Sequence, residues 1–242
     1  MQVGEDYQQL ISENLSLQSV PGYKQTLPVF TTDLQAATSQ QQAATSGNPA
    51  AIKMTRVVDF SQGALMPSGN PYNVAIEGKG FFEVREADGS TSYTRNGSFT
   101  VSPKGQLQTS DGAPVMGKGG SPITVDTSNA GTVKIGSDGS ISIDGIQQST
   151  LGFSHFDNPS ASLQPGAFGR FVAHNSNDAK SGLAPSDSVL QGSLEQSNGN
   201  PIEQMANMIM AARIYEANSK SMKAVDDNQN QLITNLGGHP QG

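Results

Sequence analysis

Apolar side chains in the first 20 positions recur every three or four residues, which is the spacing of one face of a helix. This face carries Tyr7, Leu10, Ile11, Asn14 and Leu17. Pro21 and Gly22 should end the helix, because proline disfavours helical backbone at the residue before it and glycine permits a sharp turn. The pattern predicts an N-terminal helical segment over residues 1–30.

Residues 31–56 have a different character. The stretch from Ala36 to Pro49 consists of small and polar residues. Such a segment has almost nothing to bury, so we expect it to be extended or mobile in the free chain. We interpret residues 31–56 as a polar spacer.

Short apolar runs separated by turn signals fill residues 57–196 and predict an antiparallel β domain, a partial barrel or sandwich. The runs are Phe81–Val84, Ser98–Val101, Thr132–Ile135, Ile141–Ile143 and Leu151–Phe156. The turns contain glycines at positions 89, 97, 105, 112, 139 and 145, most of them in Asp-Gly or Asn-Gly pairs. These pairs accept the positive φ of tight hairpins. We therefore expect a meander, with Gly97 in a left-handed turn before a strand that starts at Ser98.

A single long helix is predicted over residues 201–236, within a C-terminal segment of residues 197–242. Asn200 is a good N-cap, Pro201 suits the first helical position and Gly237 ends the pattern. The apolar face begins with Ile202, Met205, Met208, Ile209, Ala212 and Tyr215 and, after a phase slip, continues with Met222, Val225, Gln229, Leu232 and Leu236. The second run steps 3-4-3-4, which is the heptad seam of a coiled coil.

The long helix needs a packing partner. Its many Asn and Ser residues are mediocre helix formers, so most of its stability must come from packing. At about 1.5 Å per residue it is roughly 54 Å long, more than the β domain can cover. A methionine-containing stripe is ordinary core in most proteins, but here we favour a seam between molecules. The candidate assembly residues are Leu10, Asn14, Leu17, Met205, Met208, Ile209, Ala212, Tyr215, Met222, Val225, Leu232 and Leu236.

Composition and charge argue against several function classes. Fourteen Lys and Arg against 21 Asp and Glu give a net charge of −7, which disfavours nucleic-acid binding. The chain has no cysteine, which excludes disulfides and thiolate chemistry. No apolar run approaches the ~20 residues that span a bilayer. The first 25 residues lack the pattern of a cleaved signal peptide, so we expect export, if any, by a route that reads no such signal.

We expect no catalytic residue, metal, cofactor or small-molecule substrate. The three histidines show no metal-ligand spacing. Paired carboxylates for a hydrolase are not evident, since four aspartates each precede a glycine as turn residues do: Asp88, Asp111, Asp138 and Asp144. A secreted β-rich binding or adhesin-like module is the other alternative, although the long C-terminal helix argues against it.

Five stretches of the chain resemble the signature elements of the flagellar axial (rod and hook) proteins, in the same order. They are Asn14–Lys24 with its PGYK, Gly63–Val84 with NPYNVAIEGKGFFEV, Tyr93–Leu107 with YTRNGSF, Gly192–Asn198 with GSLEQSN and Met205–Lys220 with YEANSK. The chain is too short for the inserted domains of hook proteins. Within the family, Arg95–Ser98, Pro114–Ile123 and Val225–Asn228 look most like the proximal rod type, with the distal rod type as the alternative.

The resemblance implies a structural subunit of the bacterial flagellar basal body. Such subunits stack helically with themselves and with other rod proteins into a periplasm-spanning rod that transmits torque, after unfolded export through the flagellar export apparatus. The two terminal segments would then pair and line the inner tube, and the β domain would form the outer layer. Two features depart from the family: the segment before Asn14 is short, and Leu17 stands where a second asparagine is usual. Two explanations stay open: a misassigned start of the chain or an abbreviated N-terminal contact.

Overall fold

A computed structural model describes residues 2–32, 52–125 and 132–237. The chain forms two compact units. The first comprises Met1–Leu15, Leu27–Arg56 and Asn200–Gly242, and the second comprises Ser16–Thr26 and Val57–Gly199. The protein is mostly β, with a helix near each end, as the sequence predicted.

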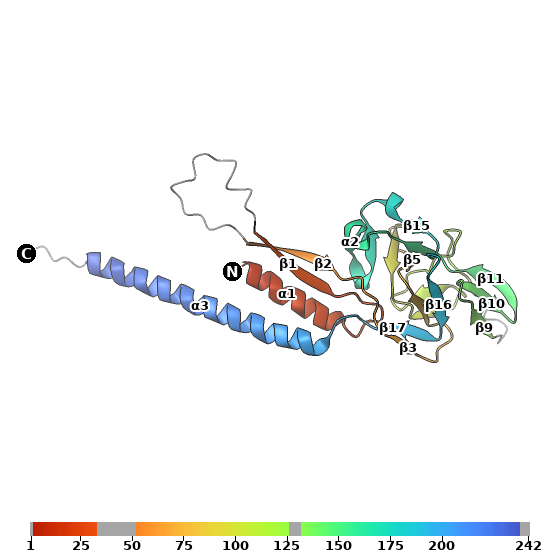
Figure 1. The fold of residues 1–242 in the computed structure, drawn as a ribbon, viewed down its shortest axis with the longest axis horizontal. Helices are drawn as coiled ribbons and strands as arrows, with labels where there is room; N and C mark the ends of the chain where they lie inside the picture. Colours follow the sequence, from red (N-terminus) through yellow and green to blue (C-terminus); the bar gives the residue numbers. More distant parts are fainter. Residues whose placement is uncertain (1, 33–51, 126–131, 238–242) are drawn as a thin grey trace, which may run out of the picture. The chain divides into compact units, whose positions relative to one another are not determined.

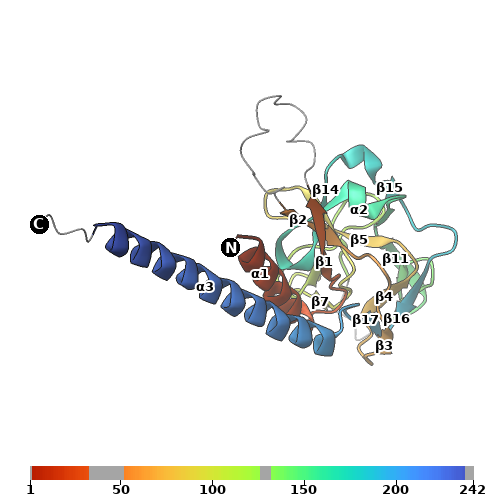
Figure 2. The same ribbon diagram turned by 60° about the vertical axis from the view of Figure 1, so that its left-hand side comes forward.

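The first unit contains the two long helices and a two-stranded sheet. Its elements are α1 (Gln2–Leu17), β1 (Thr26–Thr32), β2 (Ile52–Val58) and α3 (Pro201–Gly237), with β1 paired to β2. Figures 1 and 2 both show α1 beside the first half of α3. Both ends of the predicted spacer are strand instead, since residues 31–32 belong to β1 and residues 52–56 to β2. The rest of that prediction, residues 33–51, lies outside the described residues.

Helix α3 begins where the sequence places it. The Asn200 side chain accepts a hydrogen bond from the Ile202 amide at 3.1 Å, and its carbonyl accepts one from the Gln204 amide at 3.0 Å. This is the N-cap arrangement, which satisfies amides that have no partner within the helix. Pro201 loses nothing at the first position because its missing N–H would be unpaired there.

The second unit is a curled antiparallel β domain. The strands before the Asp144-Gly145 turn are β3 (Leu65–Pro67), β4 (Val74–Glu77), β5 (Phe81–Arg85), β6 (Thr91–Thr94), β7 (Phe99–Val101), β8 (Leu107–Thr109), β9 (Val133–Ile135) and β10 (Ser140–Ile143). Those after it are β11 (Ile146–Thr150), β12 (Phe153–His155), β13 (Leu163–Pro165), β14 (Phe171–Ala173), β15 (Lys180–Ser181), β16 (Ser188–Gln191) and β17 (Ser193–Glu195). Three short helices accompany them: α2 (Pro159–Ser162), η2 (Ala167–Gly169) and η3 (Ser176–Asp178).

The strand order differs from the predicted meander. The largest sheet runs β13-β14-β6-β5-β12-β15, so β5 and β6 of one hairpin lie between strands from much later in the chain. A three-stranded sheet, β11-β10-β9, and the pairs β16-β4, β17-β3 and β7-β8 complete the unit. Local turn signals predicted the hairpins, but pairings such as Phe153 with Phe82 join segments about 70 residues apart and have no local signal.

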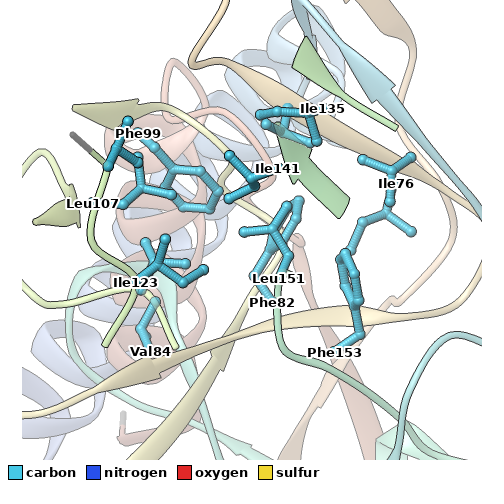
Figure 3. Packing of buried hydrophobic residues seen from close by; sticks show 14 of the residues in the cluster. Ile76, Phe82, Val84, Phe99, Leu107, Ile123, Ile135, Ile141, Leu151 and Phe153 are labelled. Atoms are coloured by element: carbon cyan, nitrogen blue, oxygen red, sulfur yellow. The ribbon is translucent and has the colours of Figure 1, made fainter. Parts of the chain in front are cut away.

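The core of the second unit lies on both faces of β5. Phe82 and Val84 point into a large cluster with Phe99 and Phe153, which Figure 3 shows from close by. Phe81 points the other way, into a second cluster around Phe156 and Phe171. Neighbouring residues of a strand face opposite sides, so the adjacent pair Phe81 and Phe82 is buried on the two opposite faces of β5.

The Asp144-Gly145 turn behaves as predicted. Both residues have positive φ, 50° and 83°, and they join β10 to β11 through a two-residue loop. This is the combination that a type I′ hairpin requires.

The prediction for Gly97 is wrong. Gly97 is not among the residues with positive φ. Its constraint is a close approach instead: a Cβ at this position would lie 1.7 Å from the Val74 carbonyl oxygen and 3.2 Å from the Phe82 ring. The Val74 amide also donates to the Gly97 carbonyl at 3.0 Å. Glycine is needed here for space rather than for backbone freedom.

Candidate functional site

One heptad seam runs along α3 and is covered only near its start. Gln204, Met208, Ala211 and Tyr215 step 4-3-4, and the spacing continues through Met222, Val225, Gln229, Leu232 and Leu236. Gln204 and Ala211 are only 5% and 4% exposed, and Met208 is half-buried. This is the half of α3 that lies beside α1 (Figures 1 and 2). The start of the seam is therefore already packed within the chain.

The rest of the same seam is exposed. Tyr215, Met222, Val225 and Leu232 all lie at the surface, the last two with 54% and 60% of their area exposed. Helix α1 has 16 residues and α3 has 37. At about 1.5 Å per residue they are roughly 24 and 55 Å long, so α1 can cover less than half of α3. The exposed part of the seam is therefore the candidate contact surface of α3.

A second apolar stripe occupies a different face of α3. It consists of Ile202, Met205, Ile209 and Ala212, all of them exposed, with Ile202 at 77%. Met205 follows the buried Gln204 directly, which places it about 100° around the helix. The sequence pattern joined this stripe to the later seam through a phase slip, but the burial pattern separates the two.

The candidate residues of α1 are packed inside the chain. Leu10 and Asn14 are buried, and Leu17 is half-buried. Of the candidate assembly residues, those exposed in this structure are therefore on α3. The side chain of Leu236 lies outside the described residues.

Three segments that are far apart in the sequence meet at a buried ion cluster in the second unit. Lys24 Nζ donates to Glu195 Oε1 at 2.5 Å, and Arg95 donates to Glu195 Oε2 at 3.2 Å. The Lys24 and Glu195 side chains are fully buried, and that of Arg95 nearly so. Each residue comes from a different element of the resemblance described above: PGYK, YTRNGSF and GSLEQSN.

Further hydrogen bonds satisfy most of the cluster. Lys24 Nζ also donates to the Ser61 carbonyl at 2.6 Å, and Arg95 donates to the Gly78 carbonyl at 2.7 Å. Glu195 accepts a third bond from the Gly63 amide at 2.8 Å. The Arg95 guanidinium lies 4.9 Å from the centre of the Phe81 ring, a cation–π contact.

Two cations share one carboxylate in this cluster. Burial lowers the pKa of Lys24 below its ordinary 10.5, although Glu195 acts in the opposite direction, and it lowers the pKa of Arg95 in the same way. Desolvation disfavours the charged form of a base, and the nearby carboxylate offsets it only in part. Glu195 is thus the one group within the cluster that balances both charges.

Asn198 extends this cluster to neighbouring segments. Its side chain accepts from the Gln25 amide at 2.9 Å and donates to the Asp59 carbonyl at 2.8 Å. The Gln25 carbonyl in turn accepts from the Asp59 amide at 2.9 Å. We call Lys24, Gln25, Asp59, Ser61, Arg95, Glu195 and Asn198 the junction cluster.

The sequence reading missed the junction cluster as a site. In the sequence these residues stand in separate motifs, and no local pattern marks them as a site. A signal was present: charged residues are only 14% of this chain, yet all three motifs carry one beside glycine or apolar residues. What the sequence did not show is that the three would meet.

Two aspartates of the turns and one histidine serve local structure. Asp88 and Asp138 each accept a bond from the amide of the serine two residues later, at 2.8 and 3.0 Å. His155 Nδ1 lies 3.1 Å from the Gly182 carbonyl oxygen. Across residues 2–32, 52–125 and 132–237, no three His, Asp or Glu residues gather as metal ligands would. None of the described helices combines the length and apolarity needed to span a membrane.

Comparisons with known proteins assign the two parts of the chain that meet at Glu195 and Arg95. Residues 75–143 match the flagellar hook protein FlgE/F/G D1 domain, and residues 190–236 match the flagellar basal body rod FlgEFG protein C-terminal region. The chain is 34% identical over 179 residues to the flagellar basal-body rod protein FlgF of Caulobacter vibrioides, covering 74% of this chain and 71% of that protein. The chain belongs to the flagellar basal-body rod family.

Other relatives agree with this family. The rod protein FlgF of Salmonella typhimurium is 36% identical over 190 residues, covering 73% of this chain and 74% of that protein. The rod protein FlgG of Buchnera aphidicola subsp. Schizaphis graminum is 37% identical over 177 residues, covering 69% and 66%. Relatives named FlgF are better represented than those named FlgG. The flagellar rod family is structural rather than enzymatic.

Proposed function

We propose that this chain is an FlgF-type subunit of the proximal rod. It assembles helically with copies of itself and with other rod subunits, and the resulting rod transmits torque from the motor to the hook. The observation that carries the proposal is the α3 seam, which is packed from Gln204 to Ala211 and exposed at Tyr215, Met222, Val225 and Leu232. The FlgG-type distal rod is the alternative, supported by the relatives of that name.

The exposed half of the seam fits a helix of a neighbouring subunit. Tyr215, Met222, Val225 and Leu232 keep the heptad spacing of the packed half, so a partner helix can continue the coiled coil along α3. Leu10, Asn14 and Leu17 then have an intramolecular role at the start of the seam. This arrangement revises our expectation that they lie at the subunit interface.

The second stripe supplies a second direction of contact. Ile202, Met205 and Ile209 face away from the seam, so a different neighbour can bury them. A subunit with two unlike contact surfaces forms heterologous contacts, which generate an open helical filament when the rotation does not close. In this assembly the helical segments of residues 1–30 and 197–242 form the inner part of the rod, and the β domain of residues 57–196 forms the outer part.

The route to the assembly site is part of the proposal. The chain reaches the periplasm-spanning rod through the flagellar export apparatus. The absence of cysteine supports this route, because no disulfide can form in an oxidising compartment before assembly. Nucleic acids and small molecules have no role in this function.

One pair of variants tests the seam. Val225→Asp places a carboxylate on the exposed half of the seam, and Gln231→Asp places one on the opposite side of the helix. In the free subunit both changes lie at the surface and should leave thermal unfolding near wild type. In the rod only Val225→Asp buries an unpaired carboxylate, at a cost of several kcal/mol. We expect cells with Val225→Asp to be non-motile, with basal bodies that lack the protein, and cells with Gln231→Asp to swim.

Three results would contradict the proposal. A Val225→Asp subunit that still enters basal bodies and supports swimming would show that the seam is not an interface. A Val225→Asp subunit whose own unfolding transition collapses would show that the residue serves folding. Deletion of the gene with retained motility would reject the rod assignment itself.

A further inference from the structure

The chain passes between its two units four times, and within the described residues each crossing is tied to another by hydrogen bonds of the second unit. The crossings follow residues 15, 26, 56 and 199. Gln18 donates to the Gly199 carbonyl at 3.0 Å, which ties the first crossing to the last. Gln25 and Asn198 tie the second to the last, and Asp59 ties the third to both.

Buried charge strengthens these ties. The Gly22 amide donates to the Glu195 carbonyl at 2.8 Å, directly beside the side-chain pair of Lys24 and Glu195. Pulling the segment of residues 22–25 away from residues 195–198 would separate a buried ammonium from its buried carboxylate. Breaking such a pair costs far more than breaking an exposed one.

The strand that carries Glu195 is otherwise weakly held. β17 has three residues and pairs only with β3, through Ser193, Leu194 and Glu195. A force applied to α3 enters the second unit through Gly199 and acts on β17. Without further attachments it would open this short ladder one residue pair at a time. Glu195, at the C-terminal end of this strand, and Asn198 are bonded to segments beside the second and third connections, and Gly199 accepts the bond from Gln18 beside the first.

We infer that the junction cluster is a mechanical anchor, which distributes force arriving along any one connection over all four. Glu195 is its central positioning residue because it alone bonds Lys24, Arg95 and the Gly63 amide. Such an anchor is useful in a subunit that carries torque, so its biological role rests on the proposed function. The mechanical property itself belongs to the single chain and can be measured on it.

The absence of cysteine makes the measurement direct, because introduced cysteines are unique attachment points. Attachment at Glu203→Cys on α3 and Lys104→Cys in a turn of the second unit pulls across the junction. Attachment at Lys104→Cys and Lys134→Cys pulls within the second unit only. Lifetimes under constant force are compared for Glu195→Gln and for Leu151→Ala, a substitution that destabilises the core of the second unit.

When force is applied across the junction, we expect the Glu195→Gln variant to unfold at least ~10-fold faster than Leu151→Ala. A tenfold change in rate corresponds to a barrier difference of ~1.4 kcal/mol. On the internal axis, the two lifetimes should agree within about threefold. Equal lifetimes across the junction would overturn the inference, since the cluster would then contribute only general stability.

A second variant keeps the test decisive if Glu195→Gln does not fold. Asn198→Ala removes the bonds to Gln25 and Asp59 without leaving a charge unpaired. It is compared with Ile141→Val, a mild core substitution. We again expect the Asn198→Ala variant to unfold faster when force acts across the junction, and the two lifetimes to be similar when force acts within the second unit. Failure of this force experiment would leave the rod assignment intact. Retained motility of a deletion strain would reject the rod assignment without affecting the force result.

Discussion

Replacing Glu195 by glutamine isolates the energetic role of the buried carboxylate. Glutamine keeps the shape, and its oxygen at the Oε1 position can still accept from the Gly63 amide and Lys24, but its NH2 group then faces Arg95 with a donor where a charged acceptor stood. Two buried cations lose the one carboxylate that bonds both of them. Removing one partner of a buried ion pair costs about 3–5 kcal/mol. In a unit of this size each kcal/mol lowers the melting temperature by ~2–4 °C, so we expect a loss of roughly 6–20 °C.

The matched control is the same chemical change at an exposed pair. Lys180 donates to Asp157 at 2.6 Å, but the two side chains are 56% and 74% exposed. Water screens such pairs, and their typical contribution is ~0–1 kcal/mol. Asp157→Asn should therefore lower the melting temperature by no more than about 4 °C. A Glu195→Gln loss no larger than that of Asp157→Asn would refute the reasoning.

The pH dependence of the variant provides a second check. Without Glu195 the Lys24 amine can relieve its burial by losing its proton, which at pH 7 costs about 5 kcal/mol for a group with an ordinary pKa of 10.5. Removing the carboxylate lowers the pKa of Lys24 in the folded chain still further. Between that pKa and 10.5 the unfolded state binds more protons, so stability rises with pH. The melting deficit relative to wild type should shrink from pH 7 to pH 9.5, and a constant deficit would show that Lys24 stays charged.

Three further predictions test other parts of the structure. Gly97→Ala should destabilise the second unit by at least about 3 kcal/mol in chemical unfolding, because the new methyl group would clash with the Val74 carbonyl. Gly119 has open space around it, so Gly119→Ala should be nearly neutral in the same experiment. Thermal stability should fall as pH drops from 5 to 2. Burial raises the pKa of Asp59 and Asp111, but hydrogen bonds from Ser61 to Asp59 and from Arg170 to Asp111 outweigh this effect, so both carboxyls have pKa values below 3.8. The stabilisation that these carboxylates provide is therefore lost when they are protonated. Asp111→Asn should flatten this dependence, and an unchanged slope would contradict the assignment. Asn200→Ala should cost ~1 kcal/mol by removing the cap of α3, visible as a loss of helical circular dichroism on mild heating, and an unchanged melting curve would argue against the cap.

The sequence by itself determined the local structure of this protein. Periodicity located α1 and α3, and the cap at Asn200 and the paired turn residues Asp144 and Gly145 act within a few residues of themselves. Such signals depend on backbone geometry and short-range hydrogen bonds, which neighbouring residues specify completely. The family elements were recognisable for the same reason, since each is a continuous stretch.

Only the tertiary structure decided which segments meet. It placed β12 beside β5, and it gave Gly97 its constraint through Val74 rather than through its own φ. It separated the two stripes of α3 by covering one of them, and it brought Lys24, Arg95 and Glu195 into one buried cluster from positions up to 171 residues apart. Burial and charge pairing are properties of a site in space. They cannot be predicted from neighbouring residues because desolvation arises only when distant segments pack together and exclude the water between them.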